Sequence, residues 1–214
     1  MAQNQQMPRG RPRQYDPDVA LARAMEVFWD RGYAATSLDD LGEAMGMNRP
    51  SVYAAFGDKH ELFVKALNLY RETGHDKLRR ALAPERPLLE SVRDVFSMLL
   101  STYLSGAGAQ RGCFVFALAT SEAVRDPAIR ALVADAIGAF DAAFEARFKL
   151  ARKRGEIAPS ADPAALARLA SGLAHTLSVR ARSGEKRRAL RKVTDAFLAV
   201  ICAPPAEALK VARK

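Results

Sequence analysis

Four side chains between residues 49 and 59 indicate a chemistry of recognition rather than of catalysis. Arg49, Ser51 and Tyr53 lie close together in the chain, and Lys59 follows a short distance beyond them. Guanidinium, hydroxyl and ammonium groups bond to phosphates and to base edges. Among these four residues, Arg49 alone can grip a guanine edge with two hydrogen bonds. The chemistry that these residue types favour is therefore the binding of DNA.

Two short helices would have to position these side chains. A capping motif begins at Ser37, and a break at 46–48 separates this helix from a second one over about 48–55. Val52 and Phe56 give the second helix an apolar face toward its scaffold. In such a helix-turn-helix the first helix crosses the DNA backbone and the second enters the major groove. The alternative is an ordinary helical hairpin with a solvated polar face, because short helical pairs are common in all-α domains.

The rest of the 214-residue chain predicts helices and no sheet. Apolar residues recur at spacings of three and four, and glycine and proline fall between these stretches. Hydrophobic residues make up 49% and charged residues 27%, which is typical of a soluble globular protein. No apolar run reaches the roughly 18 residues of a spanning helix, and the polar N-terminus does not resemble a secretory signal. We therefore expect a cytoplasmic protein without a membrane partner.

The sequence offers little for catalysis or for metal binding. Its two cysteines and three histidines are scattered, and none of their spacings fits a metal site. There is no glycine-rich phosphate loop and no nucleophile paired with a base in a recognisable context. A small helical enzyme is therefore disfavoured, and we expect no metal and no cofactor.

The net charge of +9 suggests nucleic-acid binding, but the excess of basic residues does not lie near the motif at 37–59. Residues 1–60 carry 7 Lys/Arg and 8 Asp/Glu, whereas residues 153–214 carry 13 and 5. The basic cluster at 180–192 is best interpreted as a solvated rim, with a second nucleic-acid contact as the alternative. Evidence for DNA binding must therefore come from the motif rather than from the total charge.

Residues 1–14 form a polar arm that we expect to be flexible. Three arginines lie in it in an Arg-Gly-Arg-Pro context that resembles an AT-hook, namely Arg9, Arg11 and Arg13. Arginines on an extended, proline-stiffened chain fit a narrow A·T-rich minor groove, where the negative potential attracts guanidinium groups. A solvated tail is the alternative.

Residues 16–62 resemble the DNA-binding domain of the tetracycline-repressor (TetR) family of bacterial transcriptional regulators. The stretch ALARAMEVFWDRGYAATSLDDLGEAMGMNRPSVYAAFGDKHELF carries the resemblance through these recurring elements in the family's order and spacing: Phe28, Gly32-Tyr33, Thr36-Ser37, Leu41, Gly46, Tyr53, Phe56, Lys59 and Leu62. The resemblance implies an all-α fold of about nine helices. It divides the chain into a flexible basic arm (1–14), a helix-turn-helix DNA-binding domain (15–62), a ligand-binding and dimerisation domain (63–203) and a frayed tail (204–214).

The resemblance also assigns roles at the DNA, position by position. Thr36 and Ser37 would lie near the phosphate backbone at the start of the first motif helix. The base-facing start of the recognition helix would hold Arg49, Pro50 and Ser51, and phosphates would be contacted by Tyr53 and Lys59. One departure concerns residues 54 and 55, which are alanines where the family usually has bulky aromatic or histidine residues.

The C-terminal half contains aromatic side chains at helical spacing, which usually indicates a hydrophobic core. The resemblance favours a pocket among them for a mostly apolar small-molecule effector. The candidate lining residues are Tyr70, Phe96, Leu99, Tyr103, Cys113, Phe114, Phe116, Phe140, Phe144 and His175. A helix start at Cys113 and the neighbouring Arg111 would lower the thiol pKa, whereas an inert buried thiol is the alternative.

The last two predicted helices carry apolar residues that would form a four-helix interface with a second copy. These residues are Leu166, Leu169, Leu173, Leu177, Leu190, Val193, Phe197 and Val200. The resemblance thus implies a homodimeric repressor that binds a palindromic operator and is released by a small molecule. We expect the effector to act by displacing the long helix at about 58–82. An architectural DNA-binding protein without a ligand is the alternative.

Overall fold

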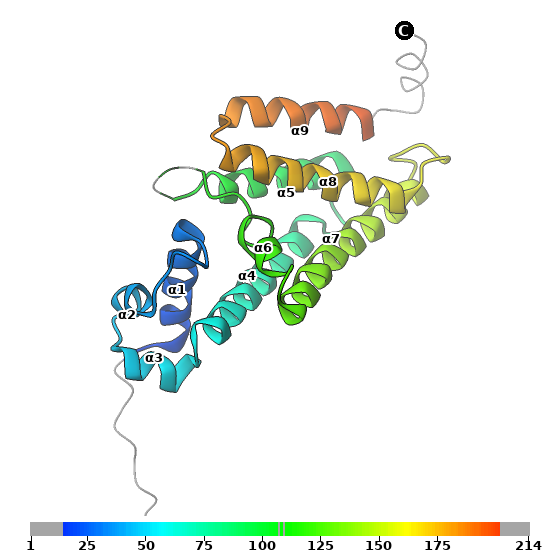
Figure 1. The fold of residues 1–214 in the computed structure, drawn as a ribbon. Coiled ribbons are helices and arrows are strands. Elements are labelled where there is room, and N and C mark those ends of the chain that lie inside the picture. The colour runs from blue at the N-terminus through cyan, green and yellow to red at the C-terminus, as the bar shows by residue number, and fades with distance from the viewer. Residues whose placement is uncertain (1–14, 107, 109, 202–214) are drawn as a thin grey trace, which may run out of the picture.

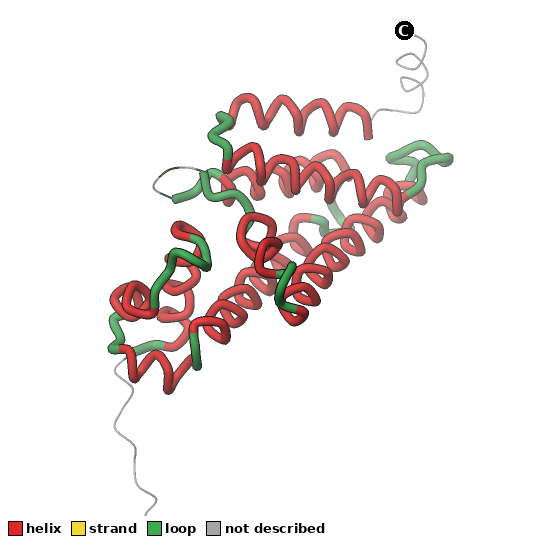
Figure 2. Tube along the Cα trace, in the orientation of Figure 1, coloured by secondary structure: helices red, strands yellow, loops and turns green. Residues whose placement is uncertain are grey.

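The computed structural model describes residues 15–106, 108 and 110–201. Within these ranges the chain forms nine α-helices, one π-helical turn and no strand, which confirms the all-α prediction (Figures 1 and 2). The elements are α1 (Pro17–Arg31), α2 (Leu38–Met45), α3 (Arg49–Phe56), α4 (Lys59–Ala81), α5 (Leu88–Tyr103), the π-turn (Val115–Ala119), α6 (Thr120–Glu122), α7 (Pro127–Lys153), α8 (Pro163–Arg182) and α9 (Arg187–Ile201). None of these helices is long and apolar enough to cross a membrane.

The helices form two units that share α4. Helices α1 to α3 lie together at one end, and α4 runs from this end along α7 (Figure 1). Helices α8 and α9 are neighbours on the far side, and α5 packs against both of them. Helix α4 is therefore the direct covalent connection between the motif and the rest of the chain, as the sequence predicts.

Local side-chain caps explain where the long helices begin. Asp16, Asp126 and Asp162 each precede a proline, and each accepts hydrogen bonds from backbone N–H groups in the first turn of α1, α7 or α8. The helix predicted from about Cys113 begins at Phe114, and the Cys113 carbonyl accepts a hydrogen bond from the Ala117 N–H at 2.7 Å. The Cys113 N–H donates to the Ser178 hydroxyl of α8 at 2.7 Å.

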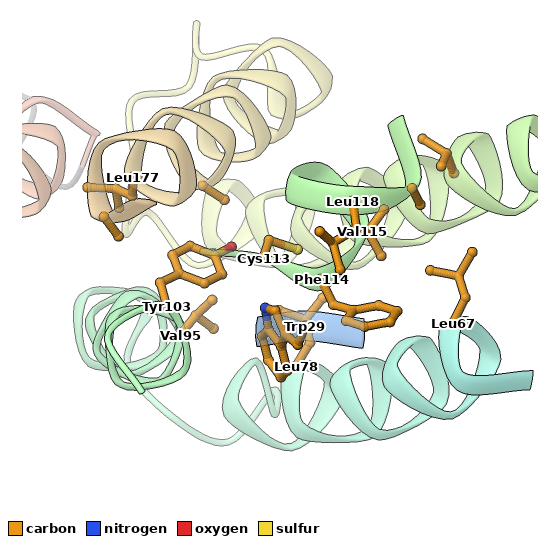
Figure 3. Packing of buried hydrophobic residues seen from close by; sticks show 14 of the residues in the cluster. Trp29, Leu67, Leu78, Val95, Tyr103, Cys113, Phe114, Val115, Leu118 and Leu177 are labelled. Atoms are coloured by element: carbon orange, nitrogen blue, oxygen red, sulfur yellow. The ribbon is translucent and has the colours of Figure 1, made fainter. Parts of the chain in front are cut away.

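The hydrophobic core is continuous between the two units. The ring of Phe28 on α1 lies 5.2 Å from that of Phe63 on α4, measured between centroids. Trp29 on α1 meets Tyr70 on α4 at 5.0 Å and Phe114 at 5.7 Å. Figure 3 shows Trp29 and Phe114 beside Leu78 in this packing. Displacement of the C-terminal helices would therefore reach α1, because these rings are in direct contact across the two units.

Candidate DNA-binding site and interior cavity

Reciprocal capping fixes the start of α2. The Asp40 N–H donates to the Ser37 hydroxyl oxygen at 3.1 Å, and the Ser37 N–H donates to the Asp40 carboxylate at 2.9 Å. The hydrogen bonds from the Ser37 side chain and backbone lower the pKa of Asp40 to about 2. This capping box was predicted from the sequence, and it sets the angle at which the chain enters the motif.

The turn between α2 and α3 depends on close backbone packing. Gly46 ends α2 in a left-handed conformation at φ +67°. A Cβ on Gly42 would lie 2.8 Å from the Met47 carbonyl oxygen, so a larger residue there would push the turn away from α2. The side chain of Asn48 then caps α3 by accepting the Ser51 N–H at 2.9 Å. These contacts fix the direction of α3 relative to α2.

Helix α3 has one buried face and one exposed face. Val52 and Phe56 are buried in the motif's core. Arg49 and Pro50 are exposed at the start of the helix, and Tyr53 retains 46% of its accessible surface. The predicted division of α3 into a scaffold face and an outward face is therefore present in the structure.

The other residues predicted to contact DNA are less accessible than Arg49 or already have partners within the protein. Ser51 and Lys59 are half-buried, and the Lys59 ammonium lies 4.6 Å from the centre of the Tyr33 ring. Ser37 is exposed, but its hydroxyl already bonds to Asp40 at 2.6 Å. The predicted arginine contacts, at Arg9, Arg11 and Arg13, lie outside the described residues.

Thr36 requires a correction to the sequence analysis. Its side chain is buried, with 2% of the residue exposed, and its hydroxyl donates to the Gly32 carbonyl at 2.7 Å. This bond ties the α1–α2 loop to the end of α1. Thr36 therefore shapes the loop from within and presents no free hydroxyl to a phosphate.

Three polar contacts attach the motif to the C-terminal helices. The Lys65 ammonium on α4 donates to the Phe56 carbonyl at the end of α3, at 2.6 Å. His60 near the start of α4 pairs with Asp126 at the start of α7. Arg111, in the loop after α5, pairs with two acids of α1. The orientation of α3 is thus tied to segments far away in the sequence.

Arg111 makes the densest of these attachments. Its Nε donates to Asp30 at 2.6 Å, a second nitrogen donates to the same carboxylate at 2.8 Å, and a third bonds to Glu26. The guanidinium carbon also lies 5.3 Å from the centre of the Trp29 ring. This group of residues, hereafter the Arg111 clasp, joins the loop after α5 to the outer face of α1.

A cavity of about 790 Å³ lies next to this clasp, between α1, α4, α5, α7 and the segment around Cys113. Such a volume suits a small organic molecule. The predicted pocket residues that line it are Tyr70, Leu99, Tyr103, Cys113, Phe116 and Phe140. Met25, Glu26 and Trp29 of α1 also line it. These three residues are not among those predicted from the sequence, because α1 belongs to the predicted DNA-binding domain.

Four predicted pocket residues do not line this cavity. Phe96, Phe114 and Phe144 are fully buried in the core, where the rings of Phe96 and Phe144 lie 6.3 Å apart. His175 packs on the Phe116 ring at 3.7 Å between centroids, and burial lowers its pKa. These side chains support the cavity wall from behind.

The Cys113 thiol is buried, which agrees with the inert-thiol alternative. Burial raises its pKa, and Arg111 turns away from it toward α1. The Tyr70 hydroxyl donates to the sulfur at 3.4 Å. Desolvation, which raises the pKa, therefore favours the inert buried thiol over a thiol whose pKa is lowered by a helix start.

The predicted interface residues fall into two groups on α8 and α9. Leu169 and Val200 are exposed by 59% and 76%, and four others are half-buried, namely Leu166, Leu173, Val193 and Phe197. Leu177 and Leu190 are completely buried within the protomer. These two residues therefore hold α8 and α9 to their own chain and have no surface to offer a partner. Val179, exposed by 65%, was missed by the sequence analysis.

The described residues combine a capped helix-turn-helix with a separate helical unit that holds a cavity, an architecture typical of helix-turn-helix DNA-binding proteins with a second domain. The family model described as "Bacterial regulatory proteins, tetR family" matches residues 20–66. The model described as "Tetracyclin repressor-like, C-terminal domain" matches residues 89–197. The chain therefore belongs to the TetR family, and it is a DNA-binding transcriptional regulator rather than an enzyme.

Individual relatives agree with this assignment. The chain is 31% identical over 191 residues to the HTH-type transcriptional repressor ComR of Escherichia coli K12. This match covers 89% of this chain and 90% of ComR. A solved structure of a CifR cysteine mutant, complexed with 26-bp double-strand operator DNA, is 34% identical with a TM-score of 0.77, covering 90% of this chain and all of that one. Reduced NemR of E. coli, at 19% identity and a TM-score of 0.77 over 89% of this chain and 98% of that one, shares the fold.

Proposed function

We propose that this protein is a repressor that binds a palindromic operator as a homodimer and releases it when a small molecule enters the cavity. The observation that carries the proposal is the exposed face of α3, with Arg49 and Tyr53 on a helix whose other face is buried. The resemblance to the repressor ComR and to a CifR mutant bound to operator DNA supports it. The protein would act in the cytoplasm, where its DNA lies.

At the operator, Arg49 would read a base and the neighbouring groups would hold the backbone. Arg49 lies in the first turn of α3, which is the part of a recognition helix that reaches base edges. Its side chain is 3.9 Å from the Asp39 carboxylate, an exposed and weak ion pair that DNA can replace. Tyr53 and Lys59 would bond to phosphates, and Ser37, whose hydroxyl donates to Asp40, would lie near the backbone. Arg9, Arg11 and Arg13 would enter an adjacent minor groove.

A second copy of the chain would supply the second recognition helix. The exposed apolar side chains of α8 and α9, Leu169, Val179 and Val200, provide a surface that a partner can cover. The symmetry of such a dimer matches the symmetry of a palindrome, with half-sites about 34–36 Å apart. Each protomer would therefore make the same contacts, one with each half-site.

An effector would act by changing this spacing. The cavity touches α4 through Tyr70 and Leu78, and the same helix begins directly beyond α3. A displacement of α4 by a few ångströms would move α3 out of register with its half-site. A preference of about 1–3 kcal/mol for the DNA-incompetent state would make the compound a useful inducer.

Selection from a random pool of DNA duplexes tests the proposal. Repeated binding and sequencing should enrich a palindromic sequence, and a labelled duplex of that sequence should bind more tightly than a scrambled one. Uniform recovery of all sequences would contradict the proposal and would favour an architectural DNA-binding protein.

A further inference from the structure

One end of the cavity contains a buried donor that the protein leaves unused. Trp29 of α1 is 5% exposed and lines the cavity. Its Nε1 has no hydrogen-bond partner among the residues that the structure describes. Buried N–H groups nearly always have a partner, so this one calls for an acceptor. Figure 3 shows the ring nitrogen turned toward the space that Tyr103 and Cys113 border.

The direction of this N–H is fixed by the rings around it. Tyr70 and Phe114 contact the indole at near-perpendicular angles of 86° and 84°. The Arg111 guanidinium lies over the indole ring. The donor is therefore held in place before any ligand arrives, which lowers the entropic cost of binding.

Two hydroxyl groups lie beside the indole. The Tyr70 hydroxyl donates to the Cys113 sulfur at 3.4 Å, and the Tyr103 hydroxyl points toward the same residue (Figure 3). Burial raises the pKa of both tyrosines, so they stay protonated and remain donors. Sulfur is a weak acceptor, and a ligand oxygen would be a better one. The end of the cavity thus gathers three neutral donors.

Most charged residues of the lining are paired or exposed. Glu26 bonds to Arg111, and Arg71 bonds to Asn68 at 3.0 Å with Asp135 nearby at 3.8 Å, although the Arg71 Nε has no partner among the described residues. The others, Glu72, His75, Asp76 and Lys77, are exposed. An ionised ligand would lose its hydration beside the three neutral donors, and only an anion that also reaches Arg71 would find a charged partner.

We propose that the cavity binds an uncharged, largely apolar compound through one hydrogen-bond-accepting oxygen, and that Trp29 donates its indole N–H to that oxygen. The inference rests on the proposed function, because the compound is the effector which that function requires. Helix α1 packs on α2 and on α4. The effector would therefore bond directly to the DNA-binding unit, in addition to displacing α4.

The test uses the fact that Trp29 is the only tryptophan in the sequence. Protein labelled with ¹⁵N at the indole gives one side-chain resonance, which is followed during titrations. The probes are 2-decanone, camphor and cyclododecanone, each paired with the hydrocarbon that has CH₂ in place of the carbonyl. Decanoate and decylammonium complete the series as charged members.

At least one ketone should bind, move the indole proton downfield, and bind roughly three- to tenfold more tightly than its hydrocarbon. The inference is overturned if no ketone binds, if ketones and hydrocarbons bind equally, or if a charged member binds more tightly than 2-decanone. Trp29→Phe and Tyr103→Phe should each remove most of the ketone's advantage. Tyr33→Phe, a tyrosine outside the cavity lining, is the matched control. The titration of the native protein decides the matter even if Trp29→Phe does not fold.

Binding of the selected operator duplex separates this inference from the proposed function. If a ketone binds at Trp29 and the affinity for the duplex does not change, the proposed effector response is wrong while the ligand class stands. If decanoate or decylammonium releases the duplex and no ketone binds, the ligand class is wrong while the function stands.

Discussion

The α3 surface and the interior cavity present their polar groups in opposite ways. On α3, the apolar side chains Val52 and Phe56 are inside, and Arg49 and Tyr53 face solvent. In the cavity the arrangement is reversed, since Trp29 Nε1 is buried and faces inward. An exposed arginine and phenol suit contacts with DNA, whereas buried neutral donors suit an uncharged molecule. The two proposed sites therefore lie apart and would bind ligands of different chemistry.

Contacts at the junction between the two regions could transmit a structural change from one to the other. Trp29 belongs to α1 and lines the cavity, and the Arg111 clasp fixes the outer face of the same helix. The His60–Asp126 pair adds a second attachment at the start of α4. Helices α1 and α4 line the cavity and also pack against α2 and α3 respectively, so a ligand in the cavity would have structural elements through which to affect α3.

The largest expected effect concerns the dimer. Without a dimer, the α3 surface of one protomer would contact a single half-site. Leu169→Glu should place a charge in the α8–α9 interface at a cost of about 3–5 kcal/mol and abolish dimerisation. Light scattering should show the molar mass of a monomer, and the affinity for the operator should be lower than that of the native protein. Val124→Glu is the control, because Val124 is exposed by 74% and lies outside α8 and α9. A folded Leu169→Glu protein that remains dimeric would contradict the interface.

The Arg111 clasp should contribute more to stability than surface ion pairs do. Arg111→Ala removes a guanidinium with only 12% of its side chain exposed, and we expect a loss of about 1–3 kcal/mol in the free energy of unfolding. Arg79→Ala breaks an exposed pair with Asp76 and should cost less than about 1 kcal/mol. Urea denaturation of both variants gives the comparison. Equal losses in the free energy of unfolding would mean that the Arg111 clasp stabilises the protein no more than a surface ion pair does.

Arg49 and Lys59 should differ in the kind of DNA contact they make. Arg49→Ala should cost about 1–3 kcal/mol at one base pair and relax the preference there. Lys59→Ala should weaken binding to all sequences and lower the salt dependence by about one unit. Anisotropy titrations on a set of half-site variants distinguish these outcomes. Identical profiles for the two variants would show that the assumed division between base and phosphate contacts is wrong.

The smallest expected effect is a pH dependence at the start of α2. The pKa of Asp40 is lowered in the folded protein from 3.8 to about 2, so its contribution to stability is present above about pH 4. That contribution should disappear as the pH falls from about 4 to about 2. Asp40→Asn should therefore unfold more easily than the native protein at pH 6 and match it more closely near pH 2. A constant difference across this range would mean that the carboxylate charge does not matter to the cap.

Contacts between residues close in the chain are what the sequence predicted well. The capping box at Ser37 and Asp40 and the two faces of α3 depend on spacings of three or four residues. Thr36 shows a limit even at short range, because its hydroxyl satisfies a loop carbonyl instead of facing outward.

Packing between distant segments is what the sequence could not show. Helical spacing places Phe96 and Phe144 on inward faces, but it does not distinguish a cavity wall from the core behind it. The burial that raises the pKa of Cys113 and the turn of Arg111 toward α1 both arise from residues more than 40 positions away. The same holds for Leu177, whose spacing matches the interface residues although it faces its own protomer.

The central claim is that two copies of α3 read two half-sites on one face of the DNA. Hydroxyl-radical footprinting of the protein on the selected duplex tests it most directly. We expect two protected blocks with centres about one helical turn apart, or a whole multiple of it, related by the symmetry of the sequence. Continuous protection along the duplex, or a single block that Leu169→Glu leaves unchanged, would contradict it.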